Sequence, residues 1–220
     1  MTNKREKQLE DIIAHFLTPP KGIPFEIVLK AVYGVSAVPF NREQNENLLS
    51  RLADAFTNAC RNVQENPIQR PRPNEVGNDM EKIVITCLND EKLRAQTPLA
   101  ANGNKKSTGY PDVFIYTQPV PIYLEIKTYA KDNSDTTQRA FYLSPSNNPK
   151  VTQEAHHLLV GFEIEKKSPE LFIPVAFQLL DLYGMDCDMK AEFNSDNRRI
   201  YDDTRRLLDQ RVEPESKPSF

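Results

Sequence analysis

The sequence predicts an α/β (α+β) fold with a mixed central β-sheet that is flanked by helices and preceded by a helical N-terminal region. Three observations support this prediction. Apolar side chains recur at helical spacing in the first third of the chain, a proline-rich break follows at residues 65–73, and runs rich in Val, Ile, Phe and Tyr begin near residue 112. Hydrophobic residues make up 39% of the 220 residues, which suffices for one sizeable core.

Residues 1–65 are predicted to form the helical N-terminal region. Its helices are expected at residues 5–17, 25–33 and 42–64. Pro19 and Pro20 end the first of them, because proline cannot donate the backbone hydrogen bond that a helix interior needs. Further prolines between residues 65 and 73 then mark a linker or sharp turn.

Residues 74–212 are expected to form the core domain, and residues 213–220 a flexible tail. A helix over residues 75–88, with Asn74 as its N-cap, opens this domain. Strands are expected at residues 112–117, 121–130, 139–144, 157–165 and 171–182, and a closing helix at residues 202–211.

Two of these predicted strands, joined by a proline-containing turn, carry the residues that point to chemistry. Glu125 and Lys127 share a face, because side chains two apart on a strand point the same way. If the strands pair as a hairpin, Asp112 reaches the same edge. Two carboxylates and an ammonium group suit divalent-metal hydrolysis of a phosphodiester, which needs hard oxygen ligands and a cation beside the attacking water. The simpler alternative is a surface hairpin with one solvated, charged face.

A third carboxylate is expected on the helix that precedes these strands. Its buried stripe runs from Val76 to Cys87, and at roughly 100° per residue Glu81 falls at the border of that stripe. Glu75 falls on the far side, although its place in the first turn leaves it freer to move. Glu81 is therefore better placed to enter a cleft shared with the sheet, and the choice between the two stays open.

An acidic helix, then Pro111-Asp112, then Glu125-Ile126-Lys127 resembles the PD-(D/E)xK nuclease superfamily, and most of all its type II restriction endonucleases. The resemblance spans residues 74–165 and implies a restriction-endonuclease-like fold. It implies that Asp112 and Glu125 ligate Mg²⁺ with help from the Ile126 carbonyl. Lys127 would position or deprotonate the attacking water, and Glu81 would orient the metal shell or hold a second ion.

The resemblance implies a Mg²⁺-dependent, site-specific endonuclease that hydrolyses phosphodiester bonds in double-stranded DNA. A homodimer is expected, because cutting both strands of a palindrome needs two symmetry-related sites, and residues 1–65 would serve dimerisation or embrace DNA. The expected functional partner is a cognate DNA methyltransferase. Two alternatives remain: a structure-specific or repair DNA nuclease of the same fold, and a non-catalytic DNA-binding domain.

Several polar side chains near the motif are candidates for DNA contacts. Lys and Arg could bind backbone phosphates, while Ser and Asn could add hydrogen bonds. The candidates are Lys105, Lys106, Lys131, Arg139, Ser146 and Asn148, with Lys150 as a further cation. His156 and His157 face opposite ways on a strand, so at most one joins a cleft, and structural or phosphate-contacting roles are expected for them.

Composition argues against other function classes. A net charge of −3 argues against a tight, sequence-blind DNA binder. The three cysteines lack metal-ligand spacing and are expected to be buried thiols in a reducing compartment. No apolar run is long enough to span a bilayer and no secretion signal is visible, which predicts a cytoplasmic protein without a membrane partner.

Overall fold

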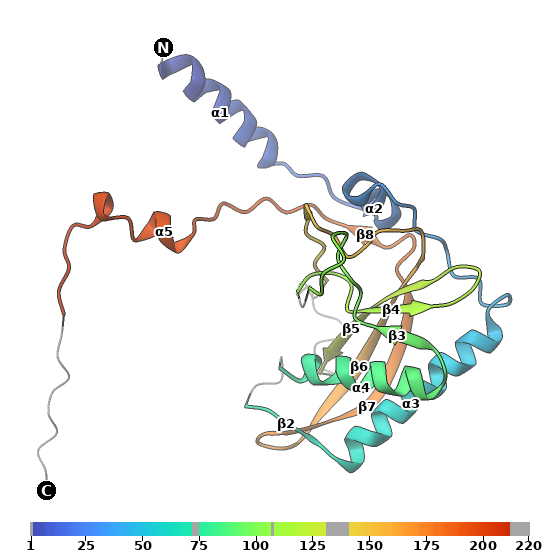
Figure 1. Cartoon of the computed structure of the whole chain (residues 1–220). Helices are drawn as coiled ribbons and strands as arrows, with labels where there is room; N and C mark the ends of the chain where they lie inside the picture. Colours follow the sequence, from blue (N-terminus) through green and yellow to red (C-terminus); the bar gives the residue numbers. More distant parts are fainter. Residues whose placement is uncertain (1, 72–74, 107, 131–140, 212–220) are drawn as a thin grey trace, which may run out of the picture. The chain divides into compact units, whose positions relative to one another are not determined.

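The computed structural model describes residues 2–71, 75–106, 108–130 and 141–211 (Figure 1). By its internal contacts the chain divides into two compact units. Residues 21–187 form the larger unit, and the smaller unit contains the residues up to 20 together with those from 188 onward. No helix among the described residues is long and apolar enough to cross a membrane.

A six-stranded mixed sheet forms the centre of the larger unit. Its strands are β2 (Ile68–Gln69), β3 (Arg94–Gln96), β4 (Val113–Tyr116), β5 (Ile122–Tyr129), β6 (His156–Ser168) and β7 (Leu171–Asp181). They follow the order β2-β7-β6-β5-β4-β3 in space. β5 and β6 run parallel, whereas the other neighbours are antiparallel. The mixed sheet confirms the predicted fold class.

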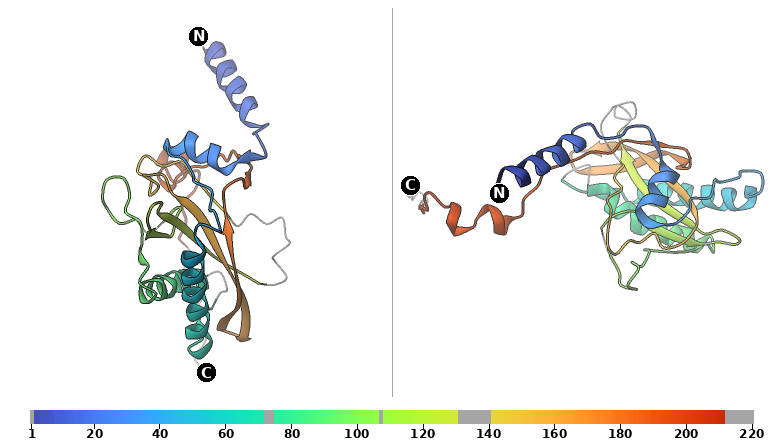
Figure 2. Two further views of the ribbon diagram at one scale, coloured as in Figure 1. Left: turned by 90° about the vertical axis from the view of Figure 1, so that its right-hand side faces the viewer. Right: turned by 90° about the horizontal axis from the view of Figure 1, so that it is seen from above.

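Helices α3 (Glu46–Glu65) and α4 (Val76–Asp90) lie side by side against one face of this sheet (Figures 1 and 2). Their apolar stripes meet the inward side chains of β4, β5 and β6 in the main core, where Phe56, Met80 and Leu124 are fully buried. Burying a side chain of this size contributes about 1.5–3 kcal/mol. The core therefore holds both helices, whose N-cap residues make no capping hydrogen bond through their side chains.

The opposite face of the sheet carries a second apolar cluster, which includes α2 (Phe25–Tyr33). Tyr123 of β5 belongs to it, because neighbouring residues on a strand point to opposite faces. Gly34 ends α2 with φ 72°, a left-handed conformation that suits glycine, and its N–H donates to the Lys30 carbonyl at 3.0 Å. A separate two-stranded sheet, β1 (Ile23–Pro24) with β8 (Asp186–Cys187), adjoins this helix.

The smaller unit contains α1 (Thr2–Phe16), α5 (Asn197–Ile200) and the 3₁₀ helix η3 (Asp203–Arg205). The helix predicted over residues 202–211 is wrong, because the chain there forms only η3 followed by irregular structure. Leu207 is 100% exposed, so no buried apolar face stabilises a short helix at this position.

Other sequence predictions differ in detail. α3 begins at residue 46 rather than 42, because the Asn41 side chain accepts a hydrogen bond from the Gln44 N–H and starts a turn. Residues 141–144 are not a strand, and residues 139 and 140 lie outside the described residues, as does the proposed N-cap Asn74. β2 and β3 were not predicted, since two or three residues are too short to show a period.

The contacts of α3 place it in the larger unit, across the domain boundary that was drawn from the sequence. α3 packs into the same core as α4 and β7, so residues 46–65 are an integral part of the larger unit. The boundaries drawn from sequence, 1–65 and 74–212, follow changes in composition, whereas the contacts join residues 21–187. The separate role of residues 1–65 stays a prediction, and the part of them outside the larger unit is residues 1–20.

Candidate active site

The β4–β5 hairpin brings two of the predicted acidic residues together. Val113 pairs with Leu124 in antiparallel register, so the next positions outward, Asp112 and Glu125, lie opposite each other. The Ile126 N–H donates a hydrogen bond to Asp112 Oδ2 at 2.8 Å. This bond fixes the Asp112 carboxylate against β5, although Asp112 itself lies one residue before β4.

Glu125 is a buried carboxylate, only 4% exposed. Its Oε1 accepts a hydrogen bond from Lys127 Nζ at 2.6 Å, whereas Oε2 is buried with no hydrogen-bond partner in the described chain. Burial and then the charge of Asp112 raise the pKa of Glu125 to about 7, and Lys127 opposes this rise. A buried carboxylate oxygen without a hydrogen-bond donor is costly, and a bound cation would offset that cost.

Lys127 is the more exposed member of this ion pair. Its side chain is 31% exposed, against 6% for that of Glu125. The two residues share a face of β5, as strand alternation requires. The ammonium group can therefore meet a substrate at the surface while the carboxylate stays inside.

Glu81 is the acidic residue of α4 that acts on this cluster. Burial and then the charge of Asp112 raise the pKa of Glu81. The charge of Glu75 acts instead on Arg70, whose pKa it raises after the stronger effect of the hydrogen-bonded Asp79. Of the two carboxylates that the sequence left open, Glu81 is the one whose pKa is raised by the charge of Asp112, and its role in the site stays a prediction.

The donor set fits a divalent cation held by two carboxylates. No three His, Cys, Asp or Glu side chains among the described residues form a metal-binding group, so Glu81 does not complete a three-residue set with Asp112 and Glu125. Mg²⁺ usually keeps several waters and takes one or two protein carboxylates. Asp112 and the unpartnered Oε2 of Glu125 meet that requirement.

Comparisons with known proteins identify the family of the chain. The model of the type II restriction enzyme MjaV family matches residues 19–204. The chain belongs to that family. It is 30% identical over 213 residues to the type II restriction enzyme MjaV of Methanocaldococcus jannaschii, and the alignment covers 89% of this chain and 92% of the relative. No solved structure matches the chain significantly.

Membership in the MjaV family confirms the enzyme class expected from the sequence, a type II site-specific deoxyribonuclease. It also favours an enzyme over the non-catalytic DNA-binding alternative. The hairpin and α4 lie within the matched residues, whereas α1 precedes them. The carboxylate cluster thus lies in the part of the chain that matches the family model, and α1 lies before that part.

Two loops, residues 100–106 and 144–149, contain most of the predicted DNA contacts of this MjaV-family enzyme. Lys106 Nζ donates to Ser146 Oγ at 3.1 Å, and Asn148 Oδ1 accepts from the Asn102 N–H at 3.0 Å. Lys106, Ser146 and Asn148 therefore hold the loops together. Lys105 remains an exposed candidate for a DNA contact. The two other predicted contacts, Lys131 and Arg139, lie outside the described residues.

His156 and His157 are both buried. His157 Nδ1 is hydrogen-bonded to the Tyr110 hydroxyl at 2.7 Å, and burial, followed by His156, lowers the pKa of His157 to about 3. His156 Nδ1 donates to the Val38 carbonyl at 2.9 Å, and its ring packs edge-on against Phe40. These contacts assign structural roles to both histidines, one of the two roles expected for them.

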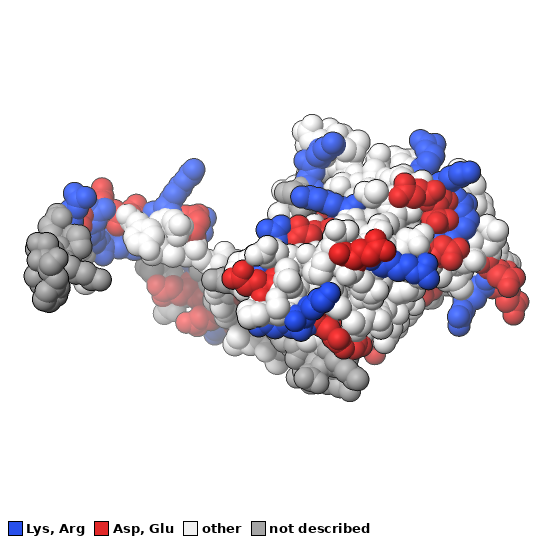
Figure 3. Space-filling view, turned by 90° about the horizontal axis from the view of Figure 1, so that it is seen from below, with Lys and Arg blue, Asp and Glu red and all other residues white. Residues whose placement is uncertain are grey.

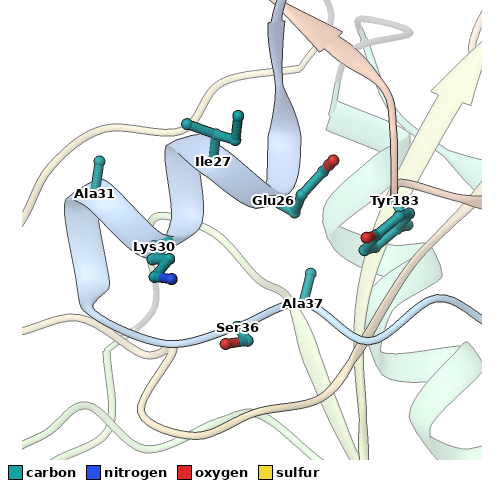
Figure 4. Close-up of a pocket in the computed structure, with 7 residues that line it drawn as sticks. All are labelled: Glu26, Ile27, Lys30, Ala31, Ser36, Ala37 and Tyr183. Carbon is teal, nitrogen blue, oxygen red and sulfur yellow. The ribbon is translucent and has the colours of Figure 1, made fainter.

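A cavity of about 430 Å³ lies away from this cluster (Figure 4). Its walls come from α2, from the segment that follows it and from the turn after β7: Glu26, Ile27, Lys30, Ala31, Ser36, Ala37 and Tyr183. None of these lining residues belongs to the carboxylate cluster. On the face shown in Figure 3, acidic and basic side chains are interspersed, as the small net charge suggests.

Proposed function

We propose that this MjaV-family enzyme hydrolyses phosphodiester bonds of double-stranded DNA with Mg²⁺. Asp112 and Glu125 would hold the ion, with the Ile126 carbonyl as a further ligand. The observation that carries the proposal is the Glu125 carboxylate, buried opposite Asp112 with one oxygen lacking a partner among the described residues and the other bound by Lys127. Glu81 would orient the water shell of the metal or support a second ion.

The protein's own groups divide the remaining tasks. When bound, Mg²⁺ would neutralise the phosphate oxygens and lower the pKa of the attacking water. Lys127, placed by its 2.6 Å contact with Glu125, positions or deprotonates that water and stabilises charge on the phosphate. Lysine suits the task because its pKa can fall on desolvation, whereas arginine cannot act as a base. The Ile126 N–H keeps the Asp112 carboxylate facing β5.

Cleavage of unmethylated phage DNA tests the proposed function. We expect discrete fragments in Mg²⁺ and none in EDTA, with identical sequence at every cut end. Protection of the same DNA by a cognate DNA methyltransferase would identify that enzyme as the functional partner. Cleavage confined to branched or damaged DNA would contradict the proposal and favour a repair nuclease of the same fold.

We further propose that the enzyme acts as a homodimer and that α1 contributes to the dimer contact. The support is an apolar stripe that remains exposed along α1 and just after it, formed by Leu9, Ile12, Ile13, Phe16 and Leu17.

Deleting residues 1–20 is expected to convert the dimer to a monomer while the larger unit stays folded. The deletion stops there because α3 belongs to the core of that unit. Light scattering after size-exclusion chromatography gives the mass, and the double variant Ile12→Asp, Phe16→Asp is the matched test without truncation. A dimer that persists in both proteins would reject the role of α1.

A further inference from the structure

Lys150 is a buried ammonium group beside the carboxylates. Its exposed fraction is 3%. Among the Lys, Arg, Asp and Glu residues of the described chain, Lys150 and Glu125 are the two that are buried. Burial lowers the pKa of Lys150, because a lysine without hydration favours its neutral form. A buried charge is retained only where other groups compensate it, so the surroundings of Lys150 require an explanation.

Two backbone carbonyls accept hydrogen bonds from Lys150 Nζ. The distances are 2.7 Å to the Gly109 oxygen and 2.9 Å to the Pro111 oxygen. These carbonyls lie on either side of Tyr110, and Pro111 directly precedes Asp112. Two of the three N–H donors of the ammonium group therefore hold the backbone of residues 109–111, which leads into Asp112.

Three carboxylates raise the pKa of Lys150, whereas burial lowers it. Asp112 raises the pKa of Lys150 most, followed by Glu125 and Glu81. When these carboxylates, Lys127 and Lys150 are all ionised, the cluster carries one net negative charge. A divalent ion together with one phosphate group would then bring it to neutrality. Without Lys150 the carboxylates would lose one of the cations that offset their mutual repulsion, leaving Lys127 and, for Glu81, also Lys82.

The backbone on both sides of Lys150 is held in place. Before it, the Pro149 carbonyl accepts a hydrogen bond from the Ala101 N–H at 2.9 Å, which ties this segment to the loop of residues 100–106. After it, Val151 is 1% exposed in the second apolar cluster. Lys150 is therefore anchored in the fold, and its burial keeps it from binding a DNA phosphate at the surface.

We propose that Lys150 is a positioning residue of the cleavage reaction. It holds the carbonyls of Gly109 and Pro111 so that Asp112 faces Glu125, and its charge lets the carboxylates stay together before the metal ion arrives. The proposal rests on the proposed Mg²⁺-dependent function and adds a residue that acts through Asp112 rather than on the substrate.

Two substitutions separate the hydrogen bonds from the charge. Lys150→Met removes both, whereas Lys150→Gln removes the charge and keeps two N–H donors on a slightly shorter side chain. We expect Lys150→Met to lower kcat about 100-fold with KM for DNA changed less than about threefold, because a misplaced ligand loses rate rather than binding. Lys150→Gln should recover about tenfold of that loss. Lys166→Met, on the exposed end of β6, is the matched control and should cleave like wild type.

Calorimetric titration with Mn²⁺, without DNA, gives a readout that a purely structural role would not move. Lys150→Gln should bind Mn²⁺ several-fold more tightly than wild type, because the ion no longer meets a neighbouring ammonium charge. Circular dichroism establishes that each variant is folded. If Lys150→Met does not fold, the cleavage rate and the Mn²⁺ affinity of Lys150→Gln test the proposal on their own.

The inference is overturned if both variants keep kcat within about threefold of wild type, or if Lys150→Gln binds Mn²⁺ with unchanged or weaker affinity. Failure of the underlying function gives a different result, namely that wild-type protein does not cleave DNA in Mg²⁺. The comparison of Mn²⁺ affinities would still test Lys150 in that case.

Discussion

Glu125→Gln is expected to abolish cleavage and, at the same time, to stabilise the metal-free protein. The amide is a poor ligand for a hard cation, and metal catalysis supplies several kcal/mol, so the rate should fall at least about a thousandfold. Binding of DNA in Ca²⁺ should weaken much less, because the loops and surface cations are unchanged. Single-turnover cleavage and filter binding measure the two effects separately.

The gain in stability follows from the pKa of Glu125. Folding raises that pKa from an ordinary 4.5 to about 7, so the folded state favours the protonated carboxyl. Ionising this carboxyl in the folded state therefore lowers the free energy of unfolding. This loss is absent below pH 4.5, grows up to about pH 7 and is complete above that value. At about 1.4 kcal/mol per pKa unit, Glu125→Gln should stabilise the metal-free protein by as much as about 3 kcal/mol above pH 7.

Denaturant unfolding at pH 5 and pH 8, in EDTA, measures this difference. The exposed Glu165→Gln on β6 is the matched control and should leave the free energy of unfolding nearly unchanged at both values. A Glu125→Gln protein that is less stable than wild type at pH 8 would show that the carboxylate is structural. Wild-type cleavage by the same variant would reject Glu125 as a metal ligand.

Lys127→Ala should lower kcat by about 10²–10⁴-fold, the range of a positioned acid or base. The side chain is 31% exposed, so its loss should change folding little, while Glu125 loses the donor on Oε1 and its pKa rises further. Quenched-flow cleavage with DNA in excess gives kcat, and binding in Ca²⁺ shows whether affinity is kept.

Lys127→Arg distinguishes the two tasks assigned to Lys127. Arginine keeps the positive charge but cannot deprotonate water, so this variant should remain impaired if proton transfer matters. Full recovery with arginine would limit Lys127 to electrostatic stabilisation of the phosphate. The exposed Lys167→Ala serves as the control for a lost surface charge. Wild-type kcat in Lys127→Ala would contradict the site.

The elements that the sequence predicted well show a clear helical or alternating period. The boundaries predicted for α2 agree with the structure, and β5 alternates between the two apolar clusters as expected, with Leu124 on one side and Tyr123 on the other. The short edge strands had no period to reveal them. The closing helix at residues 202–211 was overpredicted because an apolar pair, Leu207-Leu208, suggests burial that the structure does not provide.

In the candidate site, too, periodicity predicted some of the residues and not others. Strand alternation predicted that Glu125 and Lys127 share a face, and a hairpin was expected to bring Asp112 to the same edge; the structure adds the register that places Asp112 opposite Glu125. Lys150 could not be recognised in the same way, since its contacts with Gly109 and Pro111 join segments about 40 residues apart. Periodicity reports which face a residue occupies, but it carries no information on which loop closes over the site.

Diffraction from crystals soaked in Mn²⁺ tests the central claim most directly, because the anomalous signal locates the ion without reference to activity. The account predicts a peak between the carboxylates of Asp112 and Glu125 in wild-type protein and its loss in Glu125→Gln. A peak at another group of residues, or an unchanged peak in the variant, would contradict the assignment of this carboxylate pair as the metal site.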